Sequence, residues 1–72
     1  MIRCKENFRR IRLSRALSMR DLATASGVTP FTICRAENGR PLKPQTARKL
    51  CAALDAEFDA LFEVAGNGGS EE

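Results

Sequence analysis

The chain of 72 residues is long enough for one small domain and too short for two, and its 43% hydrophobic and 29% charged residues are typical of globular proteins. Its charge is uneven: residues 1–50 hold all 12 lysines and arginines against three acids, a net charge of +9, whereas residues 51–72 hold six acids and no base, a net charge of −6. A basic block of this kind favours a polyanionic partner; the alternative is a basic face that is merely solvated. The sequence has no membrane-length apolar run and no signal-peptide core, so we expect a cytoplasmic protein without a membrane partner. Its three cysteines are unevenly spaced and it has no histidine, so we expect reduced thiols and no bound metal.

Hydrophobic periodicity predicts helices between about residues 4 and 64 and shows no competing strand pattern. The first helix covers roughly residues 4–16, and Arg12 lies on its apolar face, where a hydrophobic side chain is expected. The second helix begins at Ser18, whose hydroxyl can accept a hydrogen bond from the amide of Asp21 while the Asp21 carboxylate accepts one from the Ser18 amide. This reciprocal capping box predicts a well-defined helix start.

A short turn separates the second helix from the third. Gly27 marks the end of the second helix, and Thr29 caps the third helix, with Pro30 in its first position. Asn38 and Gly39 close the third helix, because both residues are common where a chain leaves a helix. Two helices joined this closely, with a glycine in the turn, are typical of a helix-turn-helix motif.

The last two helices follow the short basic connection "RPLKP". The apolar residues of the fourth helix fall at helical spacing and are Ala47, Leu50, Cys51 and Leu54. We expect Asp55 to cap a short fifth helix over residues 56–64, which completes a domain of residues 1–64. Residues 65–72, "AGNGGSEE", have the composition of a flexible tail.

The run "LSMRDLATASGVTPFTICRAENG" resembles the lambda-repressor and Cro family of DNA-binding domains, also called the XRE family. The elements "LS", "DLA", "SGV", "ENG" and the closing "FDALF" stand in the register of that family, and the likeness covers roughly Phe8 to Phe62. The resemblance implies an all-α fold, a compact five-helix domain in which helices two and three form the helix-turn-helix. It also implies a bacterial or phage-encoded cytoplasmic regulator of transcription, repressor or Cro-like, that binds double-stranded operator DNA. We expect a homodimer on a pseudo-palindromic operator, with no cofactor and no small-molecule ligand.

The third helix would enter the major groove and present its outward face to the bases. With Ile33 directed to the core, Phe31 and Arg35 fall on the opposite side of the helix. Arg35 can donate two parallel hydrogen bonds to O6 and N7 of a guanine, and Phe31 can pack against a thymine methyl group. Thr29 and Thr32 lie near the helix start, within reach of a phosphate or a thymine methyl group. The alternative for Phe31 is a protein interface, because an exposed aromatic side chain does not identify its partner.

Four further residues are candidates for contacts to the phosphate backbone. Arg20 can bind a phosphate together with the free amides that open the second helix. Asn38, Arg40 and Lys43 can hold the backbone after the third helix. The alternative for Arg40 and Lys43 is that both are solvated loop charges.

Two positions depart from the pattern of the resembled family. Met19 stands where many members have a glutamine that bonds both a phosphate and the third helix, so this anchor is absent. Pro30 occupies a first reading position that is often polar, and it has neither a side-chain donor nor an amide hydrogen. We therefore expect readout to depend on Arg35, on apolar contacts and on DNA shape.

A structural ion pair is predicted between Arg12 and Glu37. Arg12 lies on the apolar stripe of the first helix, and Glu37 lies within about 40° of Ile33 on the core side of the third helix. The resemblance points the same way, since relatives often carry an arginine and a glutamate at these matching positions.

Catalysis is not expected, because the chain has no histidine or tyrosine, no glycine-rich phosphate loop followed by a lysine, and no cysteine with an evident base partner. The alternative to a DNA-binding regulator is a protein-interaction module, antitoxin-like or an anti-repressor partner, that uses the same face. We interpret Cys34 and Cys51 as small packing residues, with redox sensing by Cys34 as the open alternative. The dimer surface is not evident, and the fifth helix with Val64 is the candidate.

Overall fold

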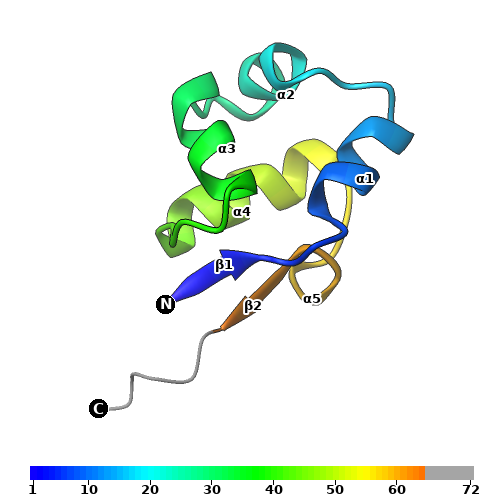
Figure 1. Cartoon of the computed structure of the whole chain (residues 1–72). Coiled ribbons are helices and arrows are strands. Elements are labelled where there is room, and N and C mark those ends of the chain that lie inside the picture. Colours follow the sequence, from blue (N-terminus) through cyan, green and yellow to red (C-terminus); the bar gives the residue numbers. More distant parts are fainter. Residues whose placement is uncertain (65–72) are drawn as a thin grey trace.

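The computed structural model describes residues 1–64 and confirms the predicted fold of five helices. In chain order the elements are β1 (Ile2–Cys4), α1 (Phe8–Ser14), α2 (Met19–Ser26), α3 (Pro30–Glu37), α4 (Pro44–Leu54), α5 (Phe58–Leu61) and β2 (Phe62–Val64) (Figure 1). No helix formed by residues 1–64 has the length and apolar character needed to cross a membrane. The tail predicted over residues 65–72 lies outside the described residues.

A small antiparallel sheet closes the domain where the sequence predicted only helix. Ile2 lies opposite Val64 and Cys4 opposite Phe62, so the two ends of the domain run side by side (Figure 1). Leu42 forms an isolated bridge to the other side of Ile2. The expectation of no strand was therefore wrong, because three-residue strands are too short to show a period of two in the sequence.

The first and last helices, α1 and α5, are both shorter than predicted. Helix α1 begins at Phe8 instead of near residue 4, because the chain before it is used in β1. The prediction that Asp55 caps α5 was wrong: Asp55 adopts a left-handed conformation with φ of 52° and ends α4. Aspartate tolerates this conformation better than most residues. Glu57 precedes α5 without a side-chain cap.

The core is assembled from every helix together with β2. The fully buried large side chains are Phe8, Leu22, Ile33, Leu50, Leu54, Leu61 and Phe62. The Phe62 ring packs between Phe8 and Phe58, with ring centroids 5.7 Å and 5.4 Å away. Burying one such side chain stabilises the fold by about 1.5–3 kcal/mol, so this apolar centre fixes how the helices are arranged.

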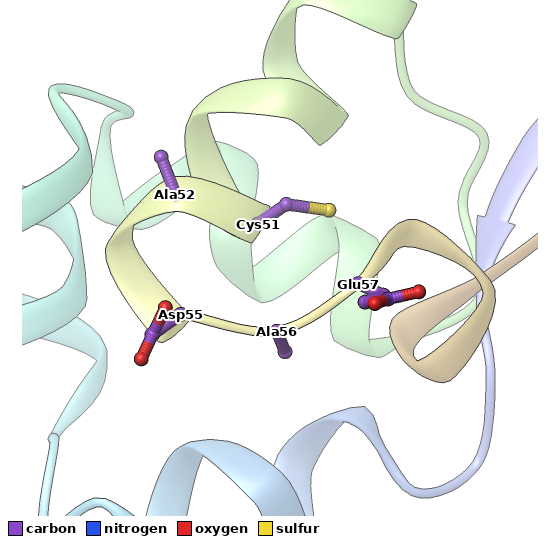
Figure 2. Close-up of a pocket in the computed structure, with 5 residues that line it drawn as sticks. All are labelled: Cys51, Ala52, Asp55, Ala56 and Glu57. Atoms are coloured by element: carbon purple, nitrogen blue, oxygen red, sulfur yellow. The ribbon is translucent and has the colours of Figure 1, made fainter.

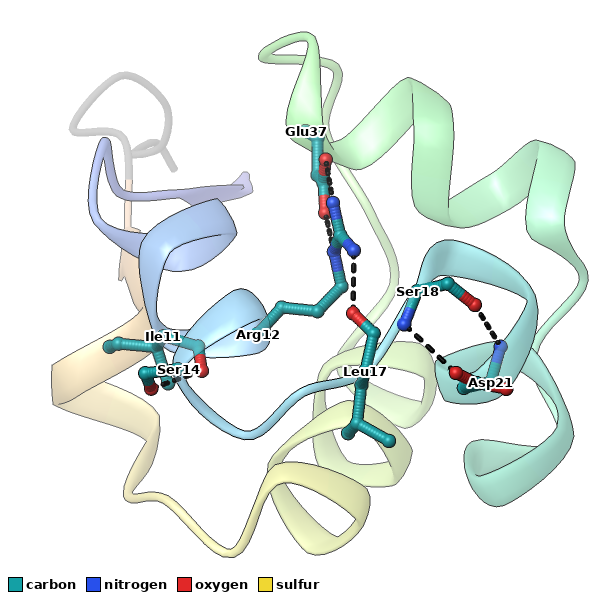
Figure 3. Close-up of polar contacts among 7 residues, drawn as sticks. All are labelled: Ile11, Arg12, Ser14, Leu17, Ser18, Asp21 and Glu37. Carbon is teal, nitrogen blue, oxygen red and sulfur yellow. Dashed lines mark hydrogen bonds and ion pairs between the residues drawn. The ribbon is translucent and has the colours of Figure 1, made fainter.

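Local hydrogen bonds define the start of α2 as the sequence predicted. The Asp21 amide donates to Ser18 Oγ at 3.0 Å, and the Ser18 amide donates to Asp21 Oδ2 at 3.1 Å (Figure 3). Gly27 ends α2 with φ of 77°, a left-handed conformation that glycine adopts without strain. Helix α3 begins at Pro30, three residues later, so the turn of the helix-turn-helix is short and is fixed from both sides.

Candidate nucleic-acid interface

The outward face of α3 carries an exposed aromatic ring beside an exposed guanidinium. Phe31 is 69% exposed, and Arg35 follows it by one helical turn on the same face, whereas Ile33 and Ala36 point into the core. Arg35 Cζ lies 5.6 Å from the centroid of the Phe31 ring, within the range of a cation–π contact. This face can offer a planar double donor and an apolar surface to one ligand.

The two threonines at the start of α3 are hydrogen-bonded to each other. Thr29 Oγ1 accepts the Thr32 amide at 3.2 Å, which confirms the predicted N-cap, and it donates to Thr32 Oγ1 at 2.9 Å. Pro30 occupies the first helical position. The geometry thus uses much of the hydrogen-bonding capacity of both hydroxyls inside the protein, and their methyl groups are what remains for an apolar contact.

A shallow pocket runs along the turn between α2 and α3. Its lining brings Arg20 of α2 together with Thr29 at the start of α3, and it includes Thr24. Thr24 is exposed one turn after Arg20 and was missed by the sequence reading, although the spacing of four residues from Arg20 places both on one face of α2. Arg20 and Thr24 can therefore both face a ligand that α3 contacts.

The connection after α3 carries the other residues that are predicted to contact DNA phosphates, and it leads to the start of α4. Asn38 ends α3 and donates through Nδ2 to Cys34 Sγ at 3.7 Å, and the Arg40 amide donates to the Arg35 carbonyl at 3.0 Å. Lys43 immediately precedes α4, and no side chain caps the amides that open this helix. The uncapped start of α4 can therefore bind an anion, which the sequence analysis did not predict. The sequence does indicate it, because Lys43 precedes Pro44 at a position where a Ser, Thr or Asp cap is usual.

Arg12 and Glu37 form the predicted ion pair behind this surface. Arg12 Nε donates to Glu37 Oε2 at 2.6 Å and Nη2 donates to Oε1 at 3.3 Å, while Nη1 donates to the Leu17 carbonyl at 2.7 Å (Figure 3). The two side chains are only 5% and 6% exposed. The pair connects α1 to the last residue of α3 and to the segment before α2. Its role is to position α3, because it lies in the interior and not on the outward face.

The cysteines differ in environment, and one of the two sequence interpretations was wrong. Cys34 is exposed on α3 and is not a packing residue, because it lies next to the outward face; Cys51 packs against the core as expected. Burial raises the pKa of the Cys51 thiol. Burial, together with the nearby charge of Glu37, raises the pKa of Cys4 to about 12.

A second surface pocket lies at the junction of α4 and α5 (Figure 2) and shares no lining residue with the pocket at the turn between α2 and α3. Its lining residues are Cys51, Ala52, Asp55, Ala56 and Glu57. The side chains of Asp55 and Glu57 make it acidic, so it is unsuited to a phosphate. Within residues 1–64 no group of His, Cys, Asp and Glu side chains could hold a metal ion.

Comparisons with known proteins agree with this geometry. A family model described as "Helix-turn-helix" matches residues 8–61. An uncharacterized HTH-type transcriptional regulator, RghRB, of Bacillus subtilis (strain 168) is 36% identical over 64 residues, which cover 86% of this chain and 46% of the relative. The HTH-type transcriptional repressor RghR of the same organism is 41% identical over 63 residues, which cover 85% of this chain and 47% of the relative. The chain spans about half the length of these curated relatives. From α1 to α5 it belongs to the helix-turn-helix family of lambda-repressor and Cro type that its sequence resembles.

Proposed function

We propose that the chain is a DNA-binding regulator of transcription that reads the major groove of a double-stranded operator with α3. The observation that carries the proposal is the exposed pair of Phe31 and Arg35 on the outward face of a helix-turn-helix. The names of the two relatives, a transcriptional regulator and a transcriptional repressor, support the same activity and favour repression. The net charge of +9 over residues 1–50, from 12 bases and three acids, supports a polyanionic partner. The bacterial cytoplasm is the compartment that we propose for this regulator.

We assign base reading chiefly to the middle of α3. Arg35 donates to O6 and N7 of a guanine, and Phe31 packs against a thymine methyl group. Thr29 and Thr32 contribute methyl contacts at the edge of the site, since their hydroxyls bond to each other.

Contacts to the phosphate backbone of DNA come from residues that precede α3 and from residues that follow it in the sequence. Arg20, on α2, meets one phosphate group; Asn38, Arg40 and Lys43, in the connection to α4, meet others near the uncapped helix start. These contacts hold the register of α3 in the groove but do not select a base.

A pseudo-palindromic operator bound by a homodimer is the arrangement we propose for this domain. Two half-sites about 34 Å apart, one turn of DNA, would each receive one copy of α3. Val64, 66% exposed at the end of β2, supports this end of the domain as the candidate dimer surface.

The test compares Arg35→Ala with Arg40→Ala on a duplex selected from a random DNA pool by the parent protein. Loss of the guanine contact in Arg35→Ala is expected to cost about 1–3 kcal/mol on the selected site and to relax the preference at one base pair, with little effect on non-specific DNA. Loss of a phosphate contact in Arg40→Ala is expected to weaken all sequences alike and to reduce the salt slope by about 1. Circular dichroism of both variants establishes that each is folded.

Two results would overturn these assignments. Equal, sequence-independent losses in both variants would make Arg35 a backbone contact and remove it from base reading. Unchanged DNA binding in both, with Phe31→Ala abolishing association with a protein partner, would replace the regulator by the protein-interaction module.

A further inference from the structure

We propose that Phe31 and Arg35 act as one unit that reads a two-base-pair step, a guanine bound by Arg35 and a thymine in the adjoining pair whose 5-methyl group packs on the Phe31 ring. This inference rests on the proposed function and makes it specific, since it names the chemical feature, a pyrimidine methyl group beside a guanine, that the operator must contain.

The first support is the small set of side chains that α3 leaves exposed. They are Pro30, Phe31, Cys34 and Arg35. Among them Arg35 is the one strong hydrogen-bond donor and Phe31 is the one large apolar surface. The readout available to this helix is therefore one polar contact and one extensive apolar contact.

The second support is that the two side chains are already together without DNA. Arg35 Cζ lies 5.6 Å from the centroid of the Phe31 ring. No carboxylate of residues 1–64 pairs with Arg35, because the ion pair of that part of the chain joins Arg12 to Glu37. The ring, and not an acid, is thus the neighbour that orients the guanidinium.

The distance between the two groups selects the neighbouring base pair. Stacked base pairs are separated by ~3.4 Å, and the Phe31 ring centroid lies 5.6 Å from Arg35 Cζ, so the ring is displaced by less than two such steps from the plane of a guanine that Arg35 binds. When Arg35 binds the guanine edge, the neighbouring pair that the Phe31 ring can reach is therefore the one directly next to that guanine. In the major groove the apolar feature of a base pair is the thymine 5-methyl group, which 5-methylcytosine also carries.

The experiment changes only that methyl group. A duplex containing the site selected by the parent protein is compared with the same duplex in which deoxyuridine replaces the thymine next to the guanine. Loss of one buried methyl group is expected to weaken binding about fourfold. Replacing the same pair by 5-methylcytosine·guanine or cytosine·guanine is expected to give a preference of similar size for the methylated base.

Variants of Phe31 and Arg35 test whether these two side chains cause the preference for the methyl group and for the guanine. In Phe31→Ala, the ratio of thymine to uracil affinity is expected to fall from about 4 to about 1. Leu13→Ala is the matched control, because Leu13 is also an exposed apolar side chain, 53% exposed on α1, and its variant is expected to keep the parent ratio. Replacing the guanine by 7-deazaguanine, which lacks N7, is expected to weaken the parent but not Arg35→Ala.

The outcomes separate this inference from the proposed function. Salt-dependent, selective binding of the parent with equal affinity for thymine and uracil would overturn the two-base-pair unit and leave the regulator intact, as would a selected site with no thymine beside a guanine. A thymine preference that persists in Phe31→Ala would also overturn it. Absence of selective DNA binding by the folded parent would overturn the proposed function itself.

Discussion

Substituting Arg12 by methionine tests whether the buried ion pair supports the position of α3. In the parent, the Arg12 guanidinium donates twice to the Glu37 carboxylate and once to the Leu17 carbonyl. Methionine fills a similar volume but provides no donor, so the carboxylate of Glu37, whose side chain is 6% exposed, loses its buried partner.

The expected cost is large in relation to the stability of the domain. Removing one partner of a buried pair typically costs about 3–5 kcal/mol, whereas a surface pair is worth roughly 0–1 kcal/mol. At about 0.05–0.15 kcal/mol per residue, the domain of residues 1–64 has a free energy of unfolding of only about 3–10 kcal/mol in total. With about 4–8 °C lost per kcal/mol, Arg12→Met should lower Tm by at least about 12 °C or unfold the domain.

Thermal melts followed by circular dichroism measure this loss against two controls. Arg9→Met removes an exposed arginine from the same helix and should change stability by less than about 0.5 kcal/mol. The double variant Arg12→Met, Glu37→Met should recover most of the loss, because an apolar pair of similar volume often replaces a buried ion pair without cost. A Tm of Arg12→Met within a degree or two of the parent, or equal shifts in Arg12→Met and Arg9→Met, would refute the reasoning.

Two further predictions use the thiols and the capping box. In the folded protein at pH 8, a thiol reagent should modify Cys34 rapidly, whereas Cys4, with a pKa of about 12, and Cys51, with a raised pKa, should react slowly; all three should react rapidly in denaturant, and Cys34→Ser should abolish the fast phase. Hydrogen bonds from Ser18 lower the pKa of Asp21 below its ordinary 3.8, so the stabilisation by this carboxylate is present above pH 3.8 and is lost as pH falls through the lowered value. Asp21→Asn should therefore melt below the parent at pH 7, and a difference that fails to shrink in melts below pH 3.8 would contradict this origin.

The central motif was predictable because its signals are local. Ser18 and Asp21 define the start of α2 by reciprocal hydrogen bonds within four residues, and the start of α3 is defined as locally, by the Thr29 cap and by Pro30 in the first position. The burial of Arg12 was also predictable, since an arginine on an apolar stripe requires a charged partner from another element.

Other features depend on long-range contacts that the sequence does not display. The sheet forms because the core brings residues 2–4 beside residues 62–64, and neither segment is long enough to predict a strand alone. Aspartate is a common residue type at helix N-caps, but the chain leaves α4 through a residue with positive φ at position 55. The hydroxyls of Thr29 and Thr32 are hydrogen-bonded to each other, which leaves them less capacity for the base reading that we propose, and only side-chain positions could establish this.

Helix α3 is held at its ends and free in its middle, so the DNA specificity that we propose for it and the stability of the domain depend on different residues. Thr29 caps its start, and Glu37, its last residue, is fixed to Arg12 in the interior. Phe31 and Arg35 lie between these anchors and are exposed, so the fold does not require either side chain. If α3 reads bases as we propose, substitutions in its middle will change which bases are read while the helix keeps its place, whereas substitutions at either end will change the position of every reading side chain together.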